Sequence, residues 1–198
     1  MGKFYAVRKG RETGIFNTWN ECQEKIKGFS GAEYKSFKSI EEAKEYINQN
    51  HKVDFDTNED FVVAYVDGSY EDSIKKYGSG VLLLKEGTII KEESFGGDEE
   101  ELVSMRNVAG EIKAAEFAMN YCIDNGYNRL IIYYDYAGIE NWCTGSWKAG
   151  KEGTIKYKEN YNNMLSKGLK VQFRKVKAHS GDKFNDMADL LAKKGVIS

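Results

Sequence analysis

Apolar and polar residues along this chain recur in short blocks that favour strands alternating with helices. Five blocks have the length and the β-branched or aromatic content of strands, at 61–66, 80–84, 88–95, 129–135 and 169–176. Gly78, Gly80 and Gly87 lie at or near the ends of these blocks, and we interpret them as strand entries and turns.

Between the later strands the apolar spacing becomes helical. The pattern predicts a long helix over about 107–125 ended by Gly126, one or two helices within 136–166, and a last helix over 184–194 ended by Gly195. The element order is therefore β-β-β-α-β-α-β-α. This order predicts an α/β fold, in detail an α+β mixed sheet with helices packed against it.

The first fifty residues carry a separate pattern. Short strands are predicted at 3–8, 13–16 and 34–37. Thr18 and Ser39 each precede a helical stretch, and each is followed three residues later by a glutamate, which is the spacing of a capping box. We therefore predict a small α+β domain over residues 1–50.

Residues 51–60 separate this module from the rest of the chain. They are polar and acidic and lack apolar periodicity, so we predict a linker there and a larger domain over 61–198. With 41% hydrophobic and 13% aromatic residues among 198, the chain has enough apolar side chains for packed cores.

The cysteines and the start of the chain bear on its environment. Cys22, Cys122 and Cys143 are widely spaced and form no C-x-x-C pair, so neither a disulfide framework nor a zinc site is predicted. The chain shows no signal-peptide pattern and no apolar run of about 20 residues. We expect a cytoplasmic protein without a membrane partner.

Charge is unevenly distributed along the chain. The net charge is −2, but residues 1–40 hold eight Lys and Arg against four acids, and 146–178 hold nine against two. Residues 61–145 hold seven basic residues against fifteen acids. Two basic segments thus flank an acidic middle, which indicates either a nucleic-acid partner or ordinary solvated lysines.

Four carboxylates occupy positions that a merely solvated acid would not favour. Asp67 and Asp135 each close an apolar strand block, where partial burial costs free energy unless a cation or hydrogen-bond donors meet the charge. Glu111 lies on a helix flank of small apolar residues, so we expect it to face the sheet. Asp189 shares a stripe of the last helix with Asn185. Sites in α/β folds tend to lie at such strand ends.

Other acids have a simpler interpretation. Asp182 and Asp186 lie before or in the first turn of the last helix, where a negative charge stabilises the helix dipole. We interpret both as structural.

If the four carboxylates converge, their chemistry requires cations. Two carboxylates about 4 Å apart repel by about 4 kcal/mol at an effective dielectric near 20, so the cluster needs cations or raised pKa values. His51 and His179 are the only histidines, so oxygen ligands dominate and Mg²⁺ or Mn²⁺ is expected rather than zinc. Two such ions suit the attack of water on a phosphodiester.

Residues 61–198 resemble a type 1 ribonuclease H domain. The motifs that carry the resemblance are Asp67-Gly68-Ser69, Asn107-x-x-x-Glu111, the strand that ends at Asp135, and Ala178-His179-Ser180-Gly181 followed by Asn185 and Asp189. The resemblance implies the ribonuclease H-like fold, with Asp67, Glu111, Asp135 and Asp189 as catalytic ligands of two Mg²⁺ ions. Mn²⁺ is expected to substitute for Mg²⁺. His179 is expected to assist proton transfer or product release.

The resemblance also implies nucleic-acid contacts by Ser69, Asn107 and Asn185. Asn107 could hydrogen-bond a ribose 2′-hydroxyl, the group that distinguishes RNA from DNA, and it could also cap its helix. His179 lies in a glycine-containing loop, where an imidazole with a pKa near 6.5 could exchange protons. The alternative for His179 is a surface or core residue without chemistry.

Two features depart from the family. Tyr136 stands directly after Asp135, where many members have a small hydroxyl residue. The basic protrusion of some relatives is shortened to 147–151, with the sequence Trp-Lys-Ala-Gly-Lys. We therefore expect a weaker grip on substrate by this domain alone.

Residues 3–47 resemble the hybrid-binding domain, of the caulimovirus VI type, that often precedes this nuclease. The matching segments are 4–11, 13–16, 18–22 and 34–37. The resemblance implies duplex contacts by Tyr5, Trp19, Tyr34 and Lys35, and aromatics interleaved with basic residues suit that role. The alternative is that the three aromatics form the core, and we favour exposure of Trp19. Ser36 replaces a second lysine of some relatives.

Together the two resemblances imply an endoribonuclease that cuts the RNA strand of RNA–DNA hybrids and leaves 3′-hydroxyl and 5′-phosphate ends. The RNA–DNA hybrid is the expected partner, double-stranded RNA is a second candidate for the N-terminal domain, and a monomer is expected. One alternative is a non-catalytic binding protein on the same fold. A nucleotide-binding ATPase is disfavoured because no G-x-x-x-x-G-K-[ST] motif exists, and a serine hydrolase because no G-x-S-x-G motif exists.

Overall fold

The structure, a computed structural model, describes residues 3–29, 31–48, 60–176 and 182–197. The described residues divide into an N-terminal unit and a larger unit formed by most of the remaining chain. Of the predicted linker, only Asp60 lies among the described residues, so the domain boundaries stay a prediction.

The N-terminal unit is a three-stranded antiparallel sheet with two helices. Its elements are β1 (Phe4–Lys9), β2 (Gly14–Phe16), α1 (Trp19–Ile26), β3 (Glu33–Phe37) and α2 (Ile40–Asn48), with strand order β2-β1-β3. Ala6, Ala43 and Tyr46 are buried in a small core between the sheet and α2. The predicted elements of this unit are confirmed.

Both predicted helix starts in this unit are capped. Thr18 Oγ1 accepts a hydrogen bond from the Glu21 amide at 3.3 Å, and Glu21 Oε2 accepts one from the Thr18 amide at 3.0 Å. Ser39 Oγ accepts from the Glu42 amide at 3.2 Å. These bonds satisfy amides that have no partner within the helix, so they fix where α1 and α2 begin.

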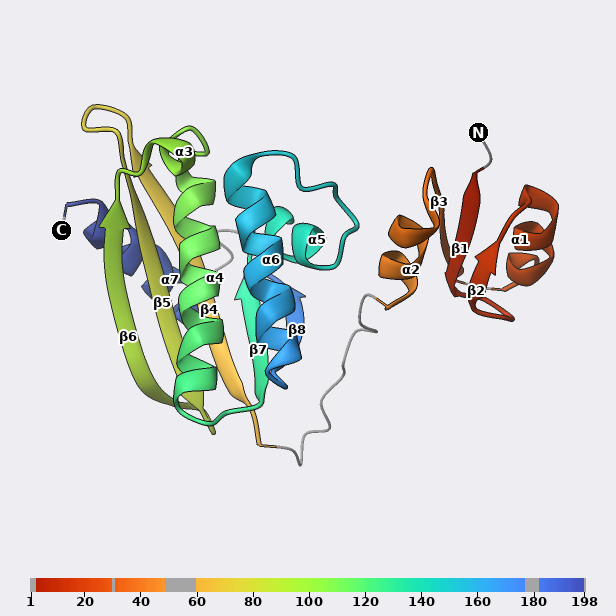
Figure 1. Cartoon of the computed structure of the whole chain (residues 1–198). Coiled ribbons are helices and arrows are strands. Elements are labelled where there is room, and N and C mark those ends of the chain that lie inside the picture. The colour runs from red at the N-terminus through yellow and green to blue at the C-terminus, as the bar shows by residue number, and fades with distance from the viewer. Residues whose placement is uncertain (1–2, 30, 49–59, 177–181, 198) are drawn as a thin grey trace. The chain divides into compact units, whose positions relative to one another are not determined.

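The larger unit is built on a five-stranded mixed sheet with the order β6-β5-β4-β7-β8 (Figure 1). Its strands are β4 (Val62–Glu71), β5 (Lys76–Lys85), β6 (Thr88–Gly97), β7 (Arg129–Tyr134) and β8 (Lys170–Lys175). The first three form an antiparallel meander, whereas β7 pairs in parallel with both β4 and β8. The predicted mixed sheet is therefore confirmed.

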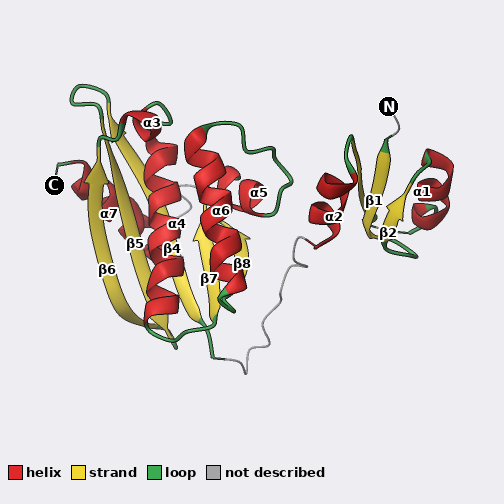
Figure 2. Ribbon diagram, viewed as in Figure 1, coloured by secondary structure: helices red, strands yellow, loops and turns green. Residues whose placement is uncertain are grey.

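Helices cover both faces of this sheet (Figure 2). They are α3 (Glu100–Val103), α4 (Asn107–Asp124), α5 (Gly138–Cys143), α6 (Glu152–Ser166) and α7 (Lys183–Val196). The pair α4 and α6 lies on one face and α7 on the other. The short helix α3 was not predicted. None of the helices in the described segments is long and apolar enough to cross a membrane.

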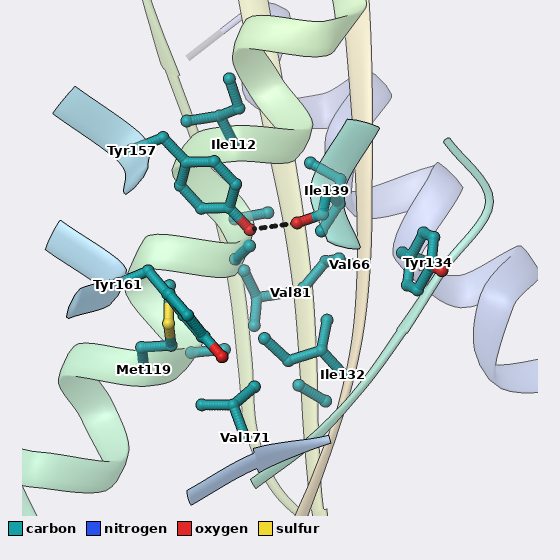
Figure 3. Close-up of a cluster of buried hydrophobic side chains, with 14 of the residues drawn as sticks. Val66, Val81, Ile112, Met119, Ile132, Tyr134, Ile139, Tyr157, Tyr161 and Val171 are labelled. Carbon is teal, nitrogen blue, oxygen red and sulfur yellow. Dashed lines mark hydrogen bonds between the residues drawn. The ribbon is translucent and has the colours of Figure 1, made fainter. Parts of the chain in front are cut away.

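The main core lies between the sheet and the α4–α6 layer. Figure 3 shows Val66, Val81 and Ile132 of neighbouring strands in the same cluster as Ile112 of α4, and all four side chains are buried. The hydroxyl of buried Tyr157 donates a hydrogen bond to the Ile139 carbonyl oxygen at 3.1 Å, which joins α6 to α5. This layer therefore holds α4 in place on the strands.

The predictions that Gly78 and Gly80 mark a strand entry or turn and that Gly195 ends a helix are wrong. Gly78 and Gly80 lie inside β5 rather than at its start, and Gly195 lies inside α7 rather than ending it. A Cβ at Gly80 would lie 2.0 Å from the Ala188 carbonyl oxygen, and one at Gly195 would lie 2.4 Å from that of Phe95. These glycines allow the backbones of α7 and the sheet to touch, whereas Gly87 is in a turn with a φ of 75° as predicted.

Candidate active site

Two parallel strands bring Asp67 and Asp135 to the same edge of the sheet. β4 and β7 pair in parallel, with Tyr65 opposite Tyr133. Asp67 and Asp135 each follow two residues later, so the register places them side by side. The backbone amide of Gly68 donates a hydrogen bond to Asp67 Oδ1 at 2.7 Å.

Glu111 reaches this edge from α4. A Cβ at Gly68 would lie 2.0 Å from the Asn107 carbonyl oxygen, so only glycine lets the first turn of α4 rest directly on β4. Glu111 is one turn further along the helix and is only 1% exposed. The predicted orientation of Glu111 toward the sheet is confirmed.

The three carboxylates form one cluster. Asp67, Glu111 and Asp135 each offer an oxygen, and these oxygens lie within 4.8 Å of one another. Burial, and then the charges of Asp135 and Asp67, raise the pKa of Glu111 to about 9. Burial, and then the charge of Asp135, raise the pKa of Asp67 to about 7. The pKa values of Glu111 and Asp67 are thus raised, as expected for negative charges brought together away from water.

The donor set fits a hard divalent cation. All three ligating groups are carboxylates, which suit Mg²⁺ or Mn²⁺. Glu111 Oε2 is buried and has no hydrogen-bond partner, and such an orphaned oxygen is satisfied by a cation. The residues could therefore hold the predicted metal.

Asp189 lies near this cluster but is held by a lysine. Asp189 Oδ2 accepts a hydrogen bond from Lys193 Nζ at 2.6 Å, and Asp189 is not among the three grouped ligands. Its negative charge nevertheless contributes to the raised pKa of Asp67. Its role as a fourth ligand stays a prediction.

The start of α7 supports the structural interpretation of its acids. Asp182 Oδ1 accepts hydrogen bonds from the amides of Phe184 at 3.0 Å and Asn185 at 3.3 Å, and Asp186 lies in the first turn. Asn185 is only 5% exposed, with its Oδ1 buried and unpaired. The predicted contact of Asn185 with nucleic acid stays a prediction.

Of the remaining predicted residues, Ser69 and Asn107 are described by the structure and His179 is not. Ser69 is half-buried in β4 after Gly68, and Asn107 is exposed at the start of α4. Arg106, not Asn107, is the N-terminal cap residue of α4, so the capping alternative for Asn107 is not supported. His179 lies outside the described residues, so its role stays a prediction.

A groove of about 430 Å³ adjoins the cluster through Asn107 and Tyr136, the neighbour of Asp135. Its other lining residues are Ser104, Met105, Arg106, Val108, Trp142, Lys148, Gly150, Lys151 and Thr154. The rings of Tyr136, Trp142 and Trp147 pack against one another with centroids 5.8 to 6.3 Å apart. Sequence reasoning missed Arg106 and Trp142. The mixed aromatic and basic run that begins at Trp142 was a signal for Trp142, whereas the sequence around Arg106 carries no comparable signal.

The N-terminal unit has its own aromatic surface. Trp19 lies between Tyr5 and Tyr34, with ring centroids 5.8 Å and 5.7 Å apart. Trp19 is 40% exposed and Tyr34 is 45% exposed, so the prediction that Trp19 is exposed is confirmed. Lys35 is also exposed. It lies opposite the buried Ala6 in the β1–β3 pairing, and its Nζ is 5.7 Å from the centroid of the Phe37 ring. The alternation of β3 therefore places Lys35 on the opposite face from Tyr34.

Comparison with known proteins gives a match for each unit. The family described as Ribonuclease H1 N-terminal domain matches residues 3–47, and the family described as RNase H matches residues 58–197. Ribonuclease H1 of Homo sapiens is 28% identical, in a match that covers 98% of this chain and 90% of the human protein. Ribonuclease H of Saccharomyces cerevisiae is 62% identical, over 25% of this chain and 14% of the yeast protein.

Solved structures share the fold of the larger unit. RNase H1 from Halobacterium salinarum has a TM-score of 0.58 at 20% identity, over 69% of this chain and 98% of its own. LC11-RNase H1 in complex with an RNA/DNA hybrid has a TM-score of 0.58 at 17% identity, over 69% of this chain and 96% of its own. At these identities the similarity shows the fold alone.

The mixed sheet and its layers of helices define the ribonuclease H-like fold, and the family model and the human relative make the chain a hydrolase of the ribonuclease H class. The chain belongs to the ribonuclease H family, and a ribonuclease H1 N-terminal domain precedes its nuclease unit. Both resemblances found in the sequence are thereby confirmed.

Proposed function

We propose that this protein is a Mg²⁺-dependent endonuclease that hydrolyses the RNA strand of RNA–DNA hybrids and leaves 3′-hydroxyl and 5′-phosphate ends. The observation that carries the proposal is the cluster of Asp67, Glu111 and Asp135, with its orphaned Glu111 oxygen, in a chain of the ribonuclease H family. A relative of the same fold is described in complex with an RNA/DNA hybrid, which supports this choice of substrate.

Four carboxylates of the chain would bind the divalent cations. Asp67, Glu111 and Asp135 would hold the cations, joined by Asp189 as the fourth ligand. The bound cations supply charge that activates the attacking water and stabilises the leaving oxygen. Because α4 rests on β4 through Gly68, the three carboxylates are fixed before substrate arrives, which is the preorganisation that such a site needs.

The groove beside the cluster suits a nucleic-acid strand. Arg106, Lys148 and Lys151 line it and can meet phosphates, while the rings of Tyr136 and Trp142 can pack against sugars or bases. Asn107 lies in the same groove, one helical turn before Glu111. Its amide is therefore available for a ribose 2′-hydroxyl close to the bond that is cut.

The aromatic surface of the N-terminal unit supports a second hold on the duplex. Tyr5, Trp19 and Tyr34 form a continuous row of rings. Stacking against such rings does not depend on base identity, so we propose that this unit binds hybrids without regard to sequence.

The test is cleavage of a hybrid with labelled RNA by the full chain in Mg²⁺. We expect cuts in the RNA strand only, with ends that carry a 3′-hydroxyl and a 5′-phosphate. Asp67→Asn should reduce the rate by at least about 10²- to 10³-fold, because it removes charge from the preorganised cluster. Asp124→Asn is the control, since Asp124 is an exposed carboxylate at the opposite end of α4.

Two outcomes would count against the proposal. A wild-type protein as inert as Asp67→Asn would indicate a non-catalytic scaffold that only binds the duplex. Cleavage that persists in excess chelator would contradict the requirement for a divalent cation.

A further inference from the structure

Lys193 lies beside the predicted metal ligands and holds one of them. Its Nζ is 2.6 Å from Asp189 Oδ2, and the two residues are four apart on α7. An acid one turn before a lysine is the favourable orientation for an ion pair on a helix. The side chains are 26% exposed for Asp189 and 58% for Lys193, so the pair is open to solvent.

The ion pair lies next to the carboxylate cluster. Gly80 is opposite Asp67 in the β4–β5 pairing, and a Cβ at Gly80 would lie 2.0 Å from the carbonyl oxygen of Ala188, the residue before Asp189. Asp189 and its lysine partner therefore border the site where Asp67, Glu111 and Asp135 meet. An ammonium group paired with Asp189 competes with any cation that binds the same carboxylate.

We propose that Lys193 is an internal counter-ion, which occupies Asp189 until a divalent cation displaces it and thereby sets the affinity of the site for that cation. The inference rests on the proposed function, because it assumes that the carboxylates bind divalent cations. At equal distance a divalent ion attracts a carboxylate twice as strongly as an ammonium group does. Ion pairs exposed to solvent are weak, so the exchange is energetically accessible.

A simpler role for Lys193 has to be separated from this one. Lys193 and Lys194 both lie in the last turn of α7, where a positive charge stabilises the helix dipole. Lys194→Met therefore removes the same charge from the same turn and is the matched control for Lys193→Met. Lys193→Arg keeps the charge beside Asp189.

The experiment measures cation binding by the full chain without substrate. Mn²⁺ binding is followed by the electron paramagnetic resonance signal of the free ion, and Mg²⁺ binding by the rise in the thermal unfolding midpoint. Lys193→Met should tighten binding by about three- to tenfold, because one competing charge is removed. Lys194→Met and Lys193→Arg should stay within about twofold of the wild type.

The effect should also depend on Asp189. In an Asp189→Asn background, adding Lys193→Met should change the binding midpoint by less than it does in the wild type, because the lysine no longer has a partner to release. Unfolding midpoints without metal show whether each variant is folded.

The outcomes distinguish the two proposals. If the wild type binds Mn²⁺ and Asp67→Asn abolishes that binding, but Lys193→Met binds with unchanged or weaker affinity, the counter-ion role is wrong and the proposed function stands. Weaker binding would indicate that Lys193 orients Asp189 for the metal. If the wild type shows no binding that Asp67→Asn removes, both the counter-ion role and the metal site of the proposed function are wrong.

Discussion

Glu111 is the residue whose burial contributes most to the free-energy cost of gathering negative charge at this site. It is almost fully buried, faces two other carboxylates and has one oxygen without a partner. The folded protein raises its pKa from 4.5 to about 9, chiefly by burial. Without metal, therefore, the folded state retains a proton that the unfolded chain releases.

This difference predicts a pH-dependent stability. The contribution of Glu111 is fully present below its unfolded pKa of 4.5 and is lost as the pH rises toward about 9. Glu111→Gln cannot ionise, so in chelator its unfolding temperature should exceed that of the wild type by a margin that grows from about pH 5.5 to about pH 8.5. Each kcal/mol gained corresponds to about 2–4 °C in a chain of this size.

Thermal unfolding of both proteins at several pH values is the measurement. Glu86→Gln, which changes an exposed carboxylate in the β5–β6 turn, controls for net charge. Saturating Mg²⁺ should remove the advantage of Glu111→Gln, since only the wild type gains a ligand there. A margin that is the same at every pH would contradict the assignment of the cost to Glu111.

At the same scale, the sequence revealed some residues of the site and not others. Asp67 and Asp135 were found because each closes an apolar run, and Glu111 because its helix flank is small and apolar. The pairing of Asp189 with Lys193 was not predicted, because acid and lysine pairs at the same spacing occur in other helices, as at Glu21 and Lys25 or Glu152 and Lys156. Which of them borders another charged cluster depends on how α7 packs against the sheet.

At the scale of elements, glycine contacts position the helices that carry the site. Gly80 lies opposite Asp67 in the β4–β5 pairing, and its Cα faces the Ala188 carbonyl oxygen of α7. Asp189 is the next residue on that helix. The absence of a side chain at Gly80 therefore determines how closely Asp189 approaches Asp67.

We expect Gly80→Ala to destabilise the protein by at least about 1–3 kcal/mol, because the new methyl group would overlap backbone atoms that cannot move independently. A Cβ there would lie 2.0 Å from the Ala188 oxygen and 2.5 Å from the Ala192 nitrogen. Gly150→Ala is the control, since nothing lies within 4 Å of a Cβ at that position. Urea unfolding of both variants decides, and equal stability would show that α7 shifts without cost.

Element boundaries show where sequence patterns stop being informative. Strand and helix types were predicted from periodicity, and the two N-terminal caps from side-chain spacing. Gly195 was taken as a helix end because glycine is common there, yet it serves close packing against Phe95 inside α7. A glycine that ends a helix and one that admits a neighbouring backbone look the same in sequence. Only the tertiary contact separates them.

At the scale of the whole molecule, two folded units share one chain. The smaller one carries an exposed aromatic row, and the larger one carries the carboxylate cluster and its groove. Joining a binding unit to a nuclease raises the local concentration of substrate at the nuclease. This arrangement predicts a division of labour between affinity and cleavage.

Deleting residues 1–50 should weaken binding to a hybrid and flatten its dependence on salt. The slope of log affinity against log salt falls in magnitude by about one for each phosphate that the protein no longer neutralises. Trp19→Ala in the full chain should weaken binding by about 1–3 kcal/mol because a stacking ring is removed, with a smaller change of slope. Fluorescence anisotropy with labelled hybrid in chelator measures both. Unchanged affinity and an unchanged pattern of cuts after the deletion would mean that the N-terminal unit contributes to neither binding nor cleavage.

The sheet topology also has a consequence for the order in which the protein folds. The β4–β5–β6 meander closes through short hairpins, whereas β4 and β7 come together only after α4 has crossed between them. Contacts of long sequence separation are slow to form. We therefore expect Asp67 and Asp135 to meet late, and Asp189 to join them only after α7 has docked on the sheet. We therefore expect a partly folded chain to carry no assembled acidic centre, so that acquisition of divalent cations coincides with completion of the fold.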